Sequence, residues 1–220
     1  MGLEIWKVTH SYGRIGAPVL RELSFVFPED CSVAVVGPSG SGKTTLLAIA
    51  GLLTAPSEGE VRIDGEPVAR GQAAELRTRL FGWVFQTVNV LSGRSVEDNA
   101  MLSLLARGKA RNEARQAARQ ALETVGLGAL GQRRANSLSG GELQRLCIAR
   151  ALATKPRFLL ADEPTGQLDR STTERVTRAL IDGRPRRTTL MMVTHDPHVA
   201  AQCDLTLALQ DGQLSIGGRA

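Results

Sequence analysis

A glycine-rich run at residues 37–45, GPSGSGKTT, contains the residue types that bind nucleotide phosphates. Its glycines let backbone N–H groups approach a phosphate closely, Lys43 can neutralise phosphate charge, and the Thr44 hydroxyl can hold Mg²⁺. The run follows an apolar stretch and precedes one with helical spacing, a context that a glycine-rich turn without chemistry would lack. The residues expected to contact phosphate are Gly37, Pro38, Ser39, Gly40, Ser41, Gly42, Lys43, Thr44 and Thr45.

A second group with chemical potential is the acidic pair in FLLADEP, residues 158–164. Asp162 and Glu163 follow an apolar run, and ligands of open α/β sheets bind at the carboxyl ends of the strands. Asp162 is expected to ligate Mg²⁺ directly or through water, and Glu163 to polarise a water for attack on a phosphate. Taken alone, the pair could equally be a solvated acidic turn. The phosphate-binding run makes the catalytic interpretation the stronger one.

A second phosphate-binding pattern occurs in LSGGELQR, residues 138–145. Ser139, Gly140 and Gly141 stand just before a stretch with helical spacing, where free N–H groups can meet an anion. One chain of 220 residues therefore carries two such patterns about a hundred positions apart.

The elements that must position these residues follow two patterns. Short apolar or alternating runs predict strands, and a segment rich in Ala, Arg, Glu, Gln and Leu predicts helices. We expect an α/β fold with a mixed sheet, an antiparallel β part in residues 1–86, a helical subdomain at 87–155, and a return to the core at 156–220. The expected strands are 3–10, 19–27, 32–36, 60–65, 158–162, 188–193 and 205–209. The expected helices are 42–53, 95–125, 171–182 and a short one after Asp196, with further helical signal up to about 153 that is broken near 126–131 and 136–141.

Composition restricts the function further. The net charge is +5, but the arginines are dispersed and no basic stripe carries interleaved aromatics, so we expect solvated surface charge and no nucleic-acid partner. No apolar run approaches the length of a membrane span, and the N-terminal residues lack a signal pattern, which favours the cytoplasm. Cys31, Cys147 and Cys203 have no CxxC spacing and are expected to be buried thiols.

Taken together, the motifs resemble the nucleotide-binding domain of an ABC transporter. The resemblance rests on GPSGSGKTT (37–45), Gln86 in VFQTVNVLSG, LSGGELQR (138–145), FLLADEPTGQLD (158–169) and VTHD (193–196), which occur in the order and spacing of that family. It implies a P-loop ATPase fold, and two domains paired head-to-tail around two ATP. The second phosphate-binding pattern would then serve ATP held by the partner chain, a second copy of this chain. Integral membrane permease subunits would hold the pair at the inner face of the cell membrane.

The same resemblance implies roles for single residues. Tyr12 matches the aromatic that stacks on adenine, although it could be an ordinary strand tyrosine. Gln86 matches the glutamine that touches Mg²⁺ and water, against the alternative of a polar turn residue. His195 matches the histidine that contacts the γ-phosphate, against a satisfied core histidine. Asp169 and Glu142 would complete the nucleotide site across the dimer. Two histidines match nothing in the family and are expected at the surface: His10 and His198.

Glu142 in LSGGE and the segment GQLD at 166–169 resemble one branch of the family, the lipoprotein-releasing, macrolide-exporting and cell-division ATPases. This branch implies ATP hydrolysis that drives export or the extrusion of lipoprotein or peptide. Two alternatives stay open: an ATPase that mechanically regulates an extracytoplasmic enzyme or sensor, and an importer ATPase. Soluble ABC ATPases of DNA repair or translation carry a long coiled-coil insert or two ATPase domains, and this sequence shows neither.

Overall fold

The computed structural model describes residues 2–13, 17–166 and 168–217. Gln167 of the GQLD segment lies outside this part of the chain. Two sheets form the framework. The first is antiparallel with the order β2-β1-β4-β5, and the second has the order β10-β9-β3-β8-β7-β6. The strands of the first sheet are β1 (Leu3–His10), β2 (Leu20–Phe27), β4 (Glu58–Ile63) and β5 (Glu66–Pro67). Those of the second are β3 (Ser32–Val36), β6 (Phe81–Val84), β7 (Phe158–Asp162), β8 (Thr189–Val193), β9 (Leu205–Gln210) and β10 (Gln213–Ile216).

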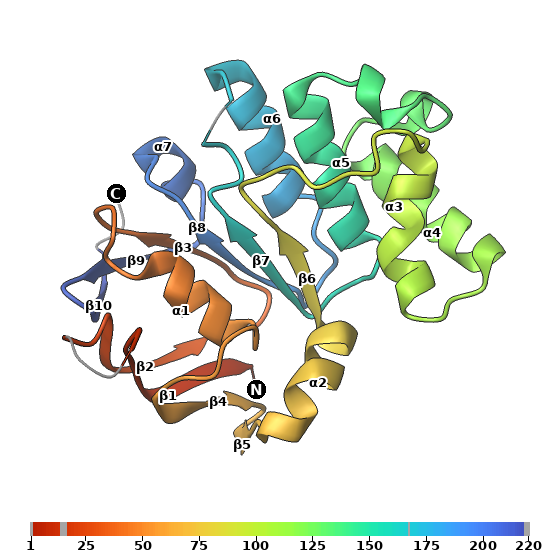
Figure 1. Cartoon of the computed structure of the whole chain (residues 1–220). Coiled ribbons are helices and arrows are strands. Elements are labelled where there is room, and N and C mark those ends of the chain that lie inside the picture. Colours follow the sequence, from red (N-terminus) through yellow and green to blue (C-terminus); the bar gives the residue numbers. More distant parts are fainter. Residues whose placement is uncertain (1, 14–16, 167, 218–220) are drawn as a thin grey trace.

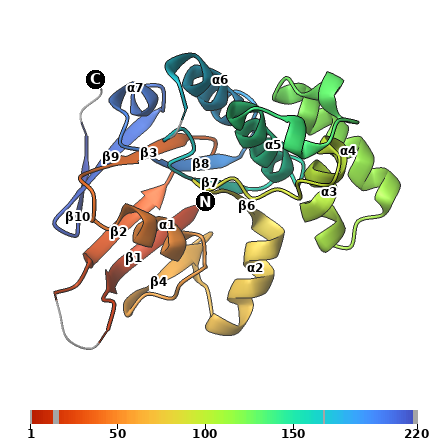
Figure 2. The same ribbon diagram turned by 45° about the horizontal axis from the view of Figure 1, so that its top comes forward.

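Helices cover both faces of the six-stranded sheet. The α-helices are α1 (Lys43–Ala50), α2 (Ala73–Leu80), α3 (Val96–Ala106), α4 (Arg111–Thr124), α5 (Gly140–Leu152), α6 (Arg170–Ile181) and α7 (Pro197–Ala200). Short 3₁₀ turns occur at Arg70–Gln72, Gly128–Leu130 and Ala135–Ser137. Figure 1 shows α3, α4 and α5 on the opposite side of the molecule from α1, and Figure 2 shows the same separation after a 45° turn.

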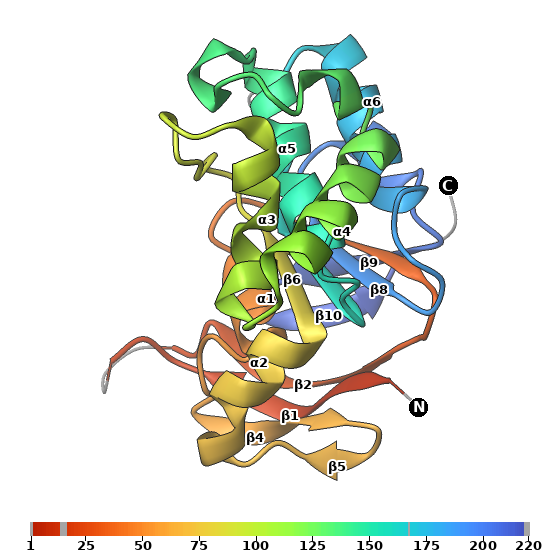
Figure 3. The ribbon, with the colours of Figure 1, turned by 90° about the vertical axis from the view of Figure 1, so that its right-hand side faces the viewer.

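The core has two hydrophobic clusters, because successive side chains of a strand point to opposite faces of a sheet. In β7, Leu159 belongs to the cluster beneath α3–α6, whereas Leu160 belongs to the cluster shared with α1 and the antiparallel sheet. The side view in Figure 3 shows the resulting layers, with the antiparallel sheet and α2 at the bottom and α3–α6 at the top. The α/β fold, with its mixed sheet and its antiparallel part, is the one expected from the sequence.

Several local expectations need correction. Helix α1 ends at Ala50 rather than Leu53, because Leu52 has a left-handed φ of 61° that breaks the helix. The expected helix at 95–125 is two helices, α3 and α4. Helix α2 and strands β6 and β10 are not among the expected elements. They are short, and α2 has no buried residue that would give it an apolar face.

His10 is buried and not at the surface, being only 7% exposed. The reason is a bulge in β1. Leu3 and Ile5 point inward, but the register against β2 shifts between Ile5 and Val8, and Lys7 has a φ of 48°. The bulge changes which side chains point inward, so Val8 and His10 are buried instead of Lys7 and Thr9. His198, by contrast, is exposed as expected.

The three cysteines are free thiols. Cys147 is buried as expected, but Cys31 and Cys203 are only half-buried, because they precede β3 and β9 rather than lying within a strand. Burial nevertheless raises the pKa of the Cys203 thiol to about 11.

Candidate functional site

Four predicted site segments meet because their strands are parallel. Strands β3, β8, β7 and β6 are neighbours in that order and all run the same way. Their carboxyl ends therefore share one edge of the sheet, where open α/β folds bind ligands. The phosphate-binding run at residues 37–45, the P-loop, follows β3, and Gln86 follows β6. Asp162 is the last residue of β7 with Glu163 directly after it, and His195 comes shortly after β8.

The P-loop is shaped by its own backbone. Gly42, the residue before α1, has a φ of 99° and provides no side-chain cap, so the first N–H groups of the helix are left for an anion. The Lys43 ammonium donates to the carbonyls of Gly37 and Pro38, each at 2.9 Å, which keeps it over the loop. The buried Ser41 hydroxyl has no hydrogen-bond partner among the described residues. These donors fit a polyphosphate.

Asp162 faces the P-loop helix. The Thr44 hydroxyl donates to Asp162 Oδ1 at 3.2 Å. Burial, together with the neighbouring Glu163 charge, raises the pKa of the Asp162 carboxyl. Among the described residues no cluster of three His, Cys, Asp or Glu side chains could hold a metal alone. One carboxylate and one hydroxyl fit Mg²⁺, which is bound by few protein ligands plus substrate phosphates.

Glu163 and His195 form a pair at this edge. His195 Nδ1 lies 2.8 Å from Glu163 Oε2. Since an ionised carboxylate only accepts, this bond places a proton on Nδ1 and leaves Nε2 for another partner. Glu163 has a φ of 43°, an unusual conformation for this residue type that is often found at functional sites. Gln86 is exposed nearby: a side chain at Gly166 would come within 3.7 Å of its Nε2.

Tyr12 lies beside the P-loop helix. The residue is 68% exposed, yet its hydroxyl is 2.9 Å from Thr45 Oγ1 on α1. An exposed aromatic ring next to a phosphate-binding loop can stack on a nucleotide base.

The second phosphate-binding segment starts α5. Ser139 caps the helix, and Glu142 completes a capping box: its Oε2 accepts from Ser139 N and from Ser139 Oγ, each at 2.8 Å. The Ser139 backbone N–H is the main reason that the pKa of the Glu142 carboxyl is lowered. The serine hydroxyl predicted to meet a phosphate is therefore bonded to Glu142.

The two glycines of this segment differ in their surroundings. A side chain at Gly141 would collide with Thr172 on α6, so packing explains that glycine. A Cβ atom at Gly140 would meet nothing within 4 Å in the part of the chain that the structure describes. Packing among the described residues therefore does not explain the glycine at 140. The close approach of a ligand from outside the chain would explain it.

The two phosphate-binding segments do not face each other within one chain. Helix α5 packs on α3, α4, α6 and β6, and α1 lies across the sheet from it (Figure 1). Asp169 caps the start of α6, where its Oδ1 accepts from Thr172 N and Ser171 Oγ. These bonds lower the pKa of the Asp169 carboxyl far below its ordinary value.

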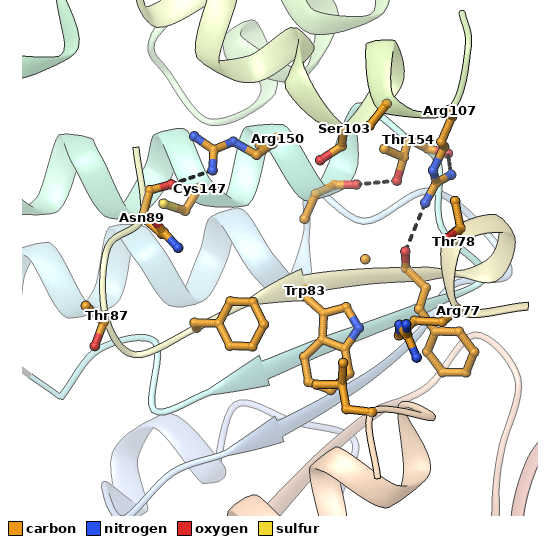
Figure 4. A pocket seen from close by; sticks show the side chains of 16 residues that line it. Arg77, Thr78, Trp83, Thr87, Asn89, Ser103, Arg107, Cys147, Arg150 and Thr154 are labelled. Atoms are coloured by element: carbon orange, nitrogen blue, oxygen red, sulfur yellow. Dashed lines mark hydrogen bonds between the residues drawn. The ribbon is translucent and has the colours of Figure 1, made fainter. Parts of the chain in front are cut away.

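A groove of about 380 Å³ lies where the six-stranded sheet meets the helical segment (Figure 4). Trp83 and Phe85, whose rings stack 5.4 Å apart, form part of its lining. Arg77, Arg107 and Arg150 also line it, and each donates to backbone carbonyls rather than to a carboxylate. Among the described residues none of the three forms an ion pair. Sequence reasoning missed this groove, because its residues come from elements far apart in the chain.

The groove is connected to Gln86. Arg150 on α5 donates to the carbonyl of Asn89 and to both the carbonyl and side chain of Asn99 on α3. The buried Asn99 in turn bonds the N–H and carbonyl of Leu91. Two helices thus hold the segment that follows Gln86.

Known proteins are similar to this chain in sequence and in fold. A family profile described as "ABC transporter" matches residues 20–166. The lipoprotein-releasing system ATP-binding protein LolD of Bordetella pertussis is 44% identical over 200 residues, which cover 89% of this chain and 87% of that protein. The macrolide export ATP-binding/permease protein MacB of Marinobacter nauticus is 38% identical over 217 residues, covering 96% of this chain and 34% of that protein.

A solved structure shares the whole fold. It is the dimeric, post-hydrolysis state of the ATP-binding cassette MJ0796 bound to ADP and Pi, with a TM-score of 0.85, 31% identity and 99% of each chain covered. The LolD and MacB relatives confirm the expected resemblance to the lipoprotein-releasing and macrolide-exporting branch. No helix among the described residues is long and apolar enough to cross a membrane. The chain belongs to the ABC transporter family, as one of its ATP-binding domains.

Proposed function

We propose that this ABC ATPase closes as a head-to-tail homodimer around two ATP molecules and drives membrane partners in export or in the extrusion of lipoprotein or peptide. The observation that carries the proposal is the separation of two phosphate-binding segments within one chain, one of them with open space at Gly140. A second copy can bring that segment to the P-loop. The dimeric MJ0796 cassette and the LolD and MacB relatives support this proposal.

The site residues of the chain would have separate roles in binding and hydrolysis. Lys43 and the N–H groups at the start of α1 hold the phosphates, and Tyr12 holds the base. Glu163 orients the attacking water and accepts its proton. The His195 ring, protonated on both nitrogens, would donate from Nδ1 to Glu163 and from Nε2 to the γ-phosphate. Ser139 and Gly140 of the partner, together with Asp169, would close the site from the other side. Loss of the γ-phosphate removes contacts that favour the closed dimer.

A dilution series tests dimeric catalysis. If each site needs two chains, the rate of ATP hydrolysis per chain must rise with chain concentration until the dimer is saturated. A per-chain rate that stays constant over a hundredfold dilution, in a chain shown to be monomeric throughout, would contradict the proposal.

Mg²⁺ would be held by Asp162, Thr44 and Gln86, and when bound it would neutralise phosphate charge. Because burial raises the pKa of Asp162, its ionised form lowers stability at neutral pH, and this penalty fades as the pH falls below the raised pKa. We expect Mg²⁺ to raise the Tm of the ATP-bound chain, and Asp162→Asn to abolish that rise without lowering the Tm of the free chain. An undiminished Mg²⁺ effect in Asp162→Asn, measured by calorimetry, would exclude Asp162 as a ligand.

The groove beside Gln86 would receive a segment of the membrane partner that carries an acidic residue. The three arginines that line the groove have no carboxylate partner among the described residues, so an acidic side chain could form an ion pair with them. Through these contacts the partner would sense the state of Gln86, and it would hold the ATPase at the inner face of the membrane.

Leu53 tests the groove, because it lines the groove and is 46% exposed. We expect Leu53→Asp to reduce capture of the partner from detergent-solubilised membranes at least tenfold and to leave ATP binding unchanged. The matched control is Ile216→Asp, which changes an exposed apolar residue of β10 outside the groove. Equal capture of the partner by the two variants would contradict the proposal that the membrane partner binds in the groove.

A further inference from the structure

The imidazole of His10 lies directly against Tyr12. The two ring centroids are 4.9 Å apart and the planes meet at 86°, an edge-to-face contact. His10 is buried at the end of β1, while Tyr12 projects from the turn that follows. The buried ring is therefore the fixed partner of the exposed one.

Neither ring nitrogen of His10 has a hydrogen-bond partner among the described residues. Burying unpaired polar atoms is unfavourable, and an aliphatic side chain of similar size would fill the space without that cost. An aliphatic side chain could not make the edge-to-face contact with the Tyr12 ring, and this contact therefore explains a histidine at position 10.

Tyr12 is held at its other end as well. Its hydroxyl bonds Thr45 Oγ1, and Thr45 is buried on the helix that carries Lys43 and Thr44. An exposed tyrosine ordinarily samples several rotamers, and ordering it on binding costs free energy. With the ring fixed by His10 and the hydroxyl by Thr45, this ring is already placed beside the P-loop before a nucleotide arrives.

We propose that His10 is a positioning residue of the nucleotide-base site: it sets the plane of the Tyr12 ring so that adenine can stack without further ordering. The inference rests on the proposed function, in which Tyr12 binds the base. His10 itself does not touch the nucleotide and acts only through Tyr12.

His10→Leu is the test, because leucine fills the space without an aromatic edge. We expect the KM and Kd for MgATP to rise about three- to tenfold, the range that an aromatic pair provides, while kcat changes less than twofold. His10→Phe keeps an aromatic edge and is expected to restore most of the affinity. Thermal melts show that both variants are folded before affinities are compared.

The single tyrosine of the chain gives a direct signal. With 3-fluorotyrosine incorporated, one ¹⁹F resonance reports Tyr12 alone. We expect a sharp resonance in the wild-type chain and in His10→Phe, and a broadened or shifted one in His10→Leu. An unchanged resonance in folded His10→Leu would overturn the proposal.

A double-mutant cycle separates this inference from the site itself. If His10 acts through Tyr12, His10→Leu must have no further effect on the Kd of a Tyr12→Ala chain. If Tyr12→Ala binds MgATP as tightly as the wild-type chain, the proposal that Tyr12 stacks on the nucleotide base is wrong. If Tyr12→Ala weakens binding but His10→Leu weakens it equally in both backgrounds, the base site stands and the positioning role of His10 is refuted.

Discussion

Glu163→Gln is expected to bind MgATP as the wild-type chain does, to accumulate as an ATP-bound dimer, and to lose hydrolysis by about a hundredfold or more. The amide keeps the size of the side chain, and its oxygen can still accept the hydrogen bond from His195 Nδ1. It cannot accept the proton of the attacking water. The loss therefore falls on the chemical step, and a dimer that closes before hydrolysis accumulates.

The measurement combines steady-state hydrolysis with size-exclusion chromatography in MgATP. Glu174→Gln is the matched control, since Glu174 is an exposed acid on α6 and none of the predicted site residues. It should hydrolyse ATP at the wild-type rate. Turnover in Glu163→Gln within a few fold of the wild type would remove Glu163 from the role of base.

Ser139→Arg is expected to abolish hydrolysis while one chain alone still binds ATP within about twofold of the wild-type affinity. Ser139 is exposed, and a Cβ atom built at the neighbouring Gly140 meets nothing within 4 Å among the described residues. An arginine at this exposed position is expected to extend into solvent in the single chain and to fill the space that the partner's ATP needs. The loss of the cap costs about 1 kcal/mol of stability, too little to unfold the domain.

Calorimetric titration of dilute monomer with ATP gives the affinity, and a coupled assay at high concentration gives the rate. Ser215→Arg places the same side chain on an exposed serine of β10 and should leave both unchanged. Lost ATP binding by monomeric Ser139→Arg would mean that Ser139 serves the ATP of its own chain.

The P-loop, the acidic pair and the start of α5 could be predicted because each is a local strand–loop or loop–helix signal. Parallel strands then bring the first two to one edge without further information. Roles taken from the family, such as those of Tyr12, Gln86, His195 and Asp169, remain proposals supported by their positions.

The sequence could not predict features that depend on packing between distant segments. The bulge at Lys7 reverses the inward face of β1, so simple alternation places His10 outside. The groove combines residues of β6, α2, α3 and α5. The bond between Ser139 Oγ and Glu142 Oε2 depends on side-chain rotamers that no spacing pattern encodes.

The central claim is that one ATP is held by Lys43 of one chain and Ser139 of the other. The most direct measurement mixes two tagged chains, both Glu163→Gln, one also Lys43→Ala and the other also Ser139→Arg, and counts ATP in the dimers that form. We expect each chain alone to stay monomeric and the mixture to yield mixed dimers with one ATP per pair. A dimer of the Ser139→Arg chain alone that retains two ATP would contradict it.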